Sequence, residues 1–160
     1  MRTVIAIAAL LLPLAFAADA PEIKEGLWSI HTQTIDNPGN KKMENTSTIC
    51  RDHAYDKSVE AKAAAMKGCT KVSENILPGK RSVEMRCVIG ATTIDTKSVV
   101  TFNSDTASHS ENHSTYTPAM GGISENTMIM DQTYKGSCPA GMQPGDRTNA
   151  SGQVIHSGGR

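Results

Sequence analysis

Two histidines, His109 and His113, have the spacing that comes closest to a metal site in this 160-residue sequence. On a helix, histidines at i and i+4 project from one face and can share an ion. The residues around them indicate a strand over 106–117 that is polar on both faces. Four residues of a strand span about 13 Å, which is too far for one ion. We therefore interpret both histidines as solvated side chains.

Three methionines offer a second kind of metal ligand. Met128 and Met130 lie two residues apart, on one face of an expected strand, and Met120 lies in the preceding loop. Thioether sulfur suits Cu(I), but methionine also fills gaps in irregular cores and lines adaptable binding surfaces. Because aromatic residues make up only 4% of the chain, we favour packing or a pocket. A Cu(I)-handling protein that uses Met120, Met128 and Met130 is the alternative.

Nucleophilic or acid–base catalysis finds no support in the sequence. The chain has many serines and five histidines but no Gly-x-Ser-x-Gly elbow. Its acidic residues are scattered, so no pair stands out whose surroundings would separate two pKa values. We therefore predict no catalytic residues, no cofactor and no enzymatic activity.

Four cysteines, an even number with no Cys-x-x-Cys pair, indicate disulfides rather than a zinc or redox site: Cys50, Cys69, Cys87 and Cys138. Two strand-like runs flank Pro78-Gly79, and the hairpin that this predicts brings Cys69 and Cys87 together. We favour Cys69–Cys87, which leaves Cys50–Cys138. The shorter bridge should add roughly 3 kcal/mol to stability.

One pattern opposes this pairing. Val72 and Ile76 indicate an inward face that excludes Cys69, whereas Val83 and Met85 share a face with Cys87. A β-bulge in the first strand would reconcile the two faces. The alternative pairing is Cys50–Cys69 with Cys87–Cys138.

The first 20 residues have the features of a signal peptide. Arg2 precedes an apolar run over 4–16, and small residues allow cleavage after Ala17 or Ala20. The run is too short to span a bilayer, so we expect a periplasmic or secreted protein without a membrane span. The formal net charge is zero, which gives no reason to expect nucleic acid as a partner.

The remaining chain predicts one mainly β domain over 21–138, followed by a Pro-, Gly- and Ser-rich flexible tail over 139–160. About seven strands with short turns indicate an antiparallel meander curled into a half-barrel or barrel. One helix interrupts them over 52–67, between the second and third strands, with Asp52 as N-cap and Gly68 after its end. Its apolar positions at helical spacing are Tyr55, Val59, Ala63 and Met66.

Alternating apolar residues predict a concave face able to hold a small apolar ligand or an envelope partner. The candidate ligand-binding residues are Trp28, Ile30, Met85, Val100, Phe102, Met128 and Met130. A further hypothesis is a structural or interaction protein of the envelope, in which the polar strand over 106–117 forms an edge for an added strand.

Several short motifs occur in a familiar order. Lys24-Glu25-Gly26-Leu27-Trp28 opens the domain, Ile49-Cys50 precedes the helix, and Tyr134-Lys135-Gly136-Ser137-Cys138 closes it. Together with the cysteine hairpin, they resemble the exported bacterial family known as domain of unknown function 3617, over 23–138. The resemblance implies an exported β domain and supplies no activity or catalytic residues. The Ala-rich helix and the long tail depart from the family pattern.

Overall fold

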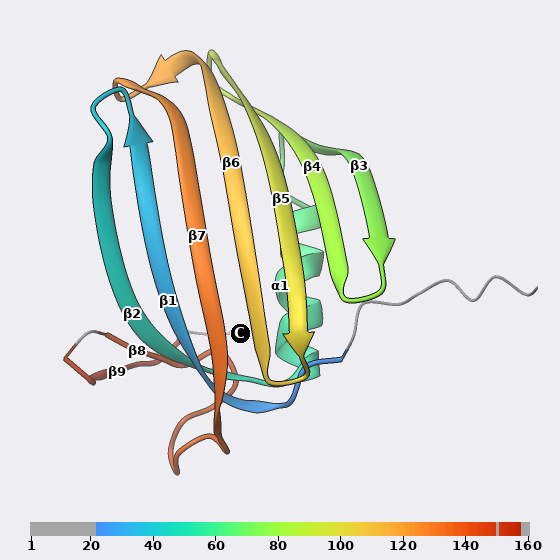
Figure 1. The fold of residues 1–160 in the computed structure, drawn as a ribbon, viewed down its shortest axis with the longest axis vertical. Helices are drawn as coiled ribbons and strands as arrows, with labels where there is room; N and C mark the ends of the chain where they lie inside the picture. Colours follow the sequence, from blue (N-terminus) through green and yellow to red (C-terminus); the bar gives the residue numbers. More distant parts are fainter. Residues whose placement is uncertain (1–21, 150, 158–160) are drawn as a thin grey trace, which may run out of the picture.

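The computed structural model describes residues 22–149 and 151–157; the predicted signal peptide over 1–20 lies outside them. One antiparallel sheet of nine strands and one helix make up the fold (Figure 1). The strands are β1 (Gly26–Asn37), β2 (Lys41–Arg51), β3 (Cys69–Leu77), β4 (Lys80–Ile89), β5 (Thr92–Ser104), β6 (Ala107–Met120), β7 (Ile123–Gly136), β8 (Arg147–Thr148) and β9 (Val154–Ile155).

The strands follow the order β3-β4-β5-β6-β7-β1-β2-β8-β9 across the sheet. Five consecutive strands, β3 to β7, form a meander, and the β1–β2 hairpin joins it through β7. In the described part of the chain no ladder joins β3 to β9, so the curved sheet stays open. The predicted antiparallel meander is confirmed in its open, half-barrel form.

The helix α1 (His53–Ala64) lies between β2 and β3 in the chain, as predicted, and begins at the expected cap. The Asp52 carboxylate accepts a hydrogen bond from the Tyr55 backbone N–H at 2.6 Å. The helix is shorter than the predicted range of 52–67, however. It ends at Ala64 with Ala65 as its C-cap, so Gly68 does not directly follow it. The predicted apolar stripe is also not buried: Val59 and Met66 are 44% and 52% exposed.

Polar interactions instead hold α1 to the sheet. Arg51 at the end of β2 donates to Asp56 at 2.9 Å, and Arg81 of β4 forms an ion pair with Glu60 at 2.6 Å. Asp56 and Glu60 are four residues apart on one face of the helix, and the helix lies along one face of the sheet, behind β4 and β5 in Figure 1. The helix therefore lies over part of this face without burying an apolar surface of its own against it.

Trp28 is the centre of a small core at one end of β1. Its side chain is fully buried, its indole N–H donates to the Lys24 carbonyl at 2.8 Å, and its ring meets Tyr134 edge-on at 5.9 Å. Gly26 is required beside it, because a Cβ there would lie 2.3 Å from the Gly136 carbonyl oxygen and the residue has φ +141°. The Gly-Leu-Trp motif thus brings β1 close to the end of β7.

The disulfides are Cys69–Cys87 and Cys50–Cys138, the pairing favoured from the sequence. The register of β3 against β4 shifts between Lys71 and Ser73, which is the bulge that the pattern of apolar residues required. Cys69 therefore lies opposite Cys87 although Val72 breaks the alternation. Both disulfides act within the sheet region: one closes the β3–β4 hairpin and the other joins β2 to the chain after β7.

The segment after Cys138 differs from the flexible tail expected over 139–160. β8 pairs with β2 at Thr48 and Ile49, and β9 pairs with β8. Asp146 is buried, and backbone hydrogen bonds join Cys50 to Asp146 and to Gly145. Strands of two residues carry no periodicity, so composition alone could not show that this segment extends the sheet.

Candidate binding face

The strand register brings the candidate ligand-binding residues onto one face of the sheet. Residues directly opposite each other in neighbouring strands point the same way. One row across the sheet runs Thr32, Met130, Ser110, Val100 and Arg81; the next runs Thr34, Met128, Asn112, Ser98 and Val83. Ile30, Trp28 and Phe102 belong to the rows nearer α1's N-terminus, and Met85 belongs to a row nearer the opposite end.

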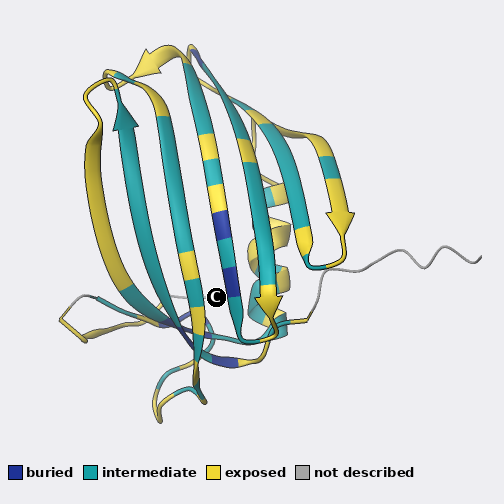
Figure 2. Ribbon diagram, in the orientation of Figure 1, coloured by how far each residue is buried: buried dark blue, intermediate teal, exposed yellow. Residues whose placement is uncertain are grey.

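We call this the inner face, because Arg51 and Arg81 point from it to the helix. Arg51 lies over the Trp28 ring, with 5.6 Å from its Cζ to the ring centroid, and also donates to Gln132 at 2.7 Å. Of the seven candidate residues only Trp28 is fully buried; the others are half-buried. Figure 2 shows how few positions of the sheet are fully buried.

A polar strip along β6 divides the apolar inner face. Ser108, Ser110, Asn112 and Ser114 alternate on this side of the strand, with Ser108 and Ser110 only 6% and 2% exposed (Figure 2). Ser114 bonds Thr96 at 2.9 Å between hydroxyl oxygens. Among the described residues, Ser110 Oγ and Asn112 Nδ2 have no hydrogen-bond partner.

Ser110 and Asn112 were not among the candidate residues. The sequence does contain a pattern that could have identified them, because every second residue from 108 to 114 is Ser or Asn. Polar residues on the other side of the strand concealed this period and made the strand look solvated on both faces. β6 is in fact a central strand, paired with β5 and β7, so the hypothesis that it offers an edge for an added strand is wrong.

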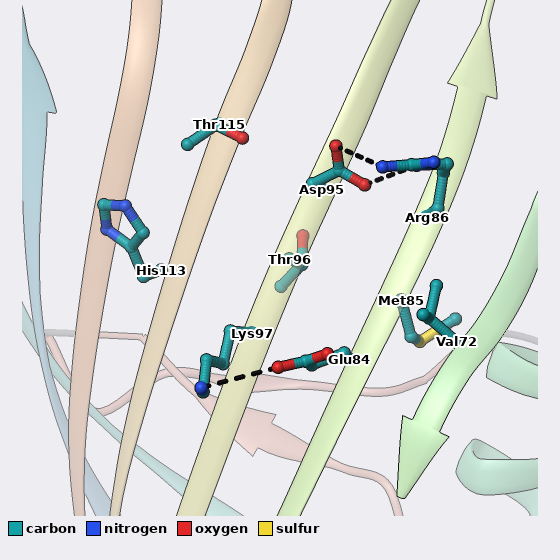
Figure 3. Close-up of a pocket in the computed structure, with 9 residues that line it drawn as sticks. All are labelled: Val72, Glu84, Met85, Arg86, Asp95, Thr96, Lys97, His113 and Thr115. Carbon is teal, nitrogen blue, oxygen red and sulfur yellow. Dashed lines mark hydrogen bonds and ion pairs between the residues drawn. The ribbon is translucent and has the colours of Figure 1, made fainter.

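The opposite, outer face carries cross-strand ion pairs. Lys97 lies 3.4 Å from Glu84, and Arg86 lies 2.6 Å from Asp95. The hydrogen bond from Arg86 lowers the pKa of Asp95 below its ordinary value. A shallow groove of about 300 Å³ lies among these side chains and reaches Met85 and Val72 near the bulge (Figure 3). Because its opposite charges pair with each other, the groove presents no unbalanced charge to a ligand.

His109 and His113 also lie on the outer face, as solvated or partly solvated side chains. His109 bonds Asp131 at 2.7 Å, which together with Glu111 raises the pKa of its imidazole. His113 bonds Thr127 Oγ1 at 3.2 Å instead. Within the described residues, no three His, Cys, Asp or Glu side chains are grouped as a metal site would require.

The structure does not bring the three methionines to one point. Met128 and Met130 are neighbours on the inner face, opposite Asn112 and Ser110. Met120 lies at the end of the β6–β7 hairpin opposite Ile123. Met128 lies five positions after Ile123, which corresponds to about 17 Å along a strand. A single copper ion cannot reach all three sulfur atoms in this arrangement.

These features define a class: an open antiparallel sheet with two disulfides, one helix and a half-covered apolar face. The sequence over residues 23–138 matches a family described as protein of unknown function, DUF3617. The chain belongs to this family, which confirms the resemblance seen in its motifs. A comparison with curated proteins finds no match. Within the described residues, no helix has the length and apolar character needed to cross a membrane.

Proposed function

We propose that this protein is an exported, non-catalytic binding module that holds a small apolar ligand on its inner face. The observation that carries the proposal is the half-buried state of Ile30, Val100, Met128 and Met130 on one side of an open sheet. Apolar side chains that stay half-buried on both sides of the polar strip of β6 are candidates for an interaction site. The helix α1 is joined to this side of the sheet by the ion pairs of Asp56 and Glu60, and none of its residues is buried.

The chemistry of the inner face supports binding rather than a reaction. Around Met128 and Met130 the polar groups are hydroxyls and amides, which orient a ligand without titrating near neutral pH. The arginines at its margins are engaged with Asp56, Glu60 and Glu74. Methionine side chains adapt to ligands of different shape.

Export agrees with the two disulfides, which persist in oxidising compartments outside the cytoplasm. The apolar N-terminal segment with its cleavage sites supports a signal peptide. We assign the mature protein to the periplasm or the extracellular medium.

Binding of the neutral dye N-phenyl-1-naphthylamine tests this proposal. Wild-type protein should increase the fluorescence of the dye saturably, because the apolar face removes the dye from water. Met130→Lys places a charge in the centre of the face and should weaken binding by about tenfold or more. The matched control is Ile129→Lys, since Ile129 is the adjacent residue and points to the outer face.

If both variants lose binding equally while circular dichroism shows intact folding, the dye does not bind on the inner face. Absence of saturable binding to the wild type would reject the binding module itself.

A further inference from the structure

Two buried polar groups in the centre of the inner face are without protein partners. Ser110 is 2% exposed, and neither its hydroxyl nor the Asn112 amide nitrogen is hydrogen-bonded among the described residues. Buried polar groups in proteins are nearly always hydrogen-bonded, because an unpaired group loses its contact with water without compensation. Two such groups on one strand, two residues apart, therefore call for an explanation.

Their neighbours show what kind of molecule could supply the missing partner. Ser110 lies between Met130 and Val100, and Asn112 lies between Met128 and Ser98. Both groups can donate a hydrogen bond, and the Asn112 nitrogen can only donate. A ligand that fits should therefore present an acceptor oxygen to these two groups and aliphatic carbon to Met128, Met130 and Val100.

We propose that the inner face recognises a neutral aliphatic molecule through a carbonyl oxygen, a ketone or an ester, that accepts hydrogen bonds from Ser110 and Asn112. The proposal rests on the proposed function and names the chemical class of its ligand. The aliphatic chain lies against Met128, Met130 and Val100. The flexible methionines move aside to admit the carbonyl group.

The charges around this point favour a neutral group over a carboxylate or phosphate. The two rows that contain Ser110 and Asn112 hold two charged residues: Arg81, two strands from Ser110 at about 10 Å, and Glu74, three strands from Asn112 on β3. The Arg81 guanidinium is occupied by Glu60 and Glu74. An anion would thus lose its hydration without meeting an available cation, which is unfavourable.

Competition for bound N-phenyl-1-naphthylamine tests this recognition. The competitors are 2-undecanone and sodium undecanoate, which have the same number of carbon atoms. Wild-type protein should bind the ketone more tightly than the carboxylate. The double variant Ser110→Ala/Asn112→Leu should lose about tenfold in affinity for the ketone relative to its own affinity for the dye, which is measured in the same titrations.

Folding does not confuse this experiment, because both substitutions remove unpaired polar atoms and should leave the unfolding temperature equal or higher. Ser114→Ala is the matched control: Ser114 lies on the same strand and face, but its hydroxyl already bonds Thr96 at 2.9 Å. This variant should retain wild-type affinity for the ketone.

The outcomes separate the two proposals. If the dye binds and the double variant keeps wild-type ketone affinity, carbonyl recognition is wrong and the binding face stands. If undecanoate binds more tightly than 2-undecanone, the proposal that the ligand is a neutral molecule is wrong. If the wild type binds no dye, both proposals fail together.

Discussion

At the scale of single residues, Asp146 organises the segment that follows the family domain. Its side chain is 4% exposed and accepts hydrogen bonds from the Gln143 backbone N–H at 2.8 Å, the His156 ring at 2.9 Å and the Ser157 backbone N–H at 3.1 Å. These donors, the Gln143 N–H first, lower the pKa of Asp146 below its ordinary value. One carboxylate thus joins a turn to the last described residues.

This geometry predicts a pH-dependent attachment of the C-terminal segment. Because the folded pKa is lowered, the stabilisation is present above the ordinary carboxyl range and is lost as pH falls through the folded pKa. Hydrogen exchange measures this attachment as protection factors of the backbone amides of residues 153–157. These protection factors should fall in acid. Asp146→Asn should show reduced protection already at pH 7, since the carboxylate charge is gone.

Asp131→Asn is the control, because Asp131 pairs with His109 on the outer face and should leave the segment protected. Unchanged protection in Asp146→Asn at pH 7 would contradict the role assigned to this carboxylate.

The sequence predicted some residue roles and missed others for physical reasons. The Gly-Leu-Trp motif, the Asp52 cap and the four cysteines were recognisable because local geometry determines their chemistry. Asp146 was not, because its donors include residues eleven positions away and belong to a segment without periodicity. Ser110 and Asn112 required the register of three strands before their burial could be known.

At the scale of elements, the two disulfides should differ in what they contribute. The Cys50–Cys138 bridge spans 88 residues and the Cys69–Cys87 bridge spans 18. In the chain-entropy account, the longer loop restricts the unfolded chain more, giving about 4–5 kcal/mol against about 3 kcal/mol. Urea unfolding of the Cys50→Ser/Cys138→Ser and Cys69→Ser/Cys87→Ser variants measures both contributions. A larger loss in the hairpin variant would contradict this order.

Strand positions were predictable because turns punctuate the chain. Asn37-Pro38-Gly39-Asn40, Pro78-Gly79 and Gly121-Gly122 each separate two long strands of the sheet. The place of β6 was not predictable from its polarity. Side-chain polarity reports on solvation, whereas a succession of short hairpins determines which strands are central. The helix likewise proved to be held by Arg51 and Arg81 rather than by its apolar stripe.

At the scale of the whole molecule, the two faces of one sheet have different chemistry. The outer face is lined by ion pairs such as Arg86–Asp95, which favour solvation. The inner face carries methionines, valine and unpaired hydrogen-bond donors beneath a helix that covers only part of it. A sheet that closed into a barrel would have buried this face, whereas the open sheet leaves its apolar residues half-buried.

Native mass spectrometry of protein purified without detergent from its own cells tests the central claim most directly. Wild-type protein should carry two disulfides and one small bound organic molecule; Ile129→Lys should carry the same adduct and Met130→Lys none. A wild-type chain without any adduct, or an adduct that Met130→Lys retains in full, would contradict a ligand held on the inner face.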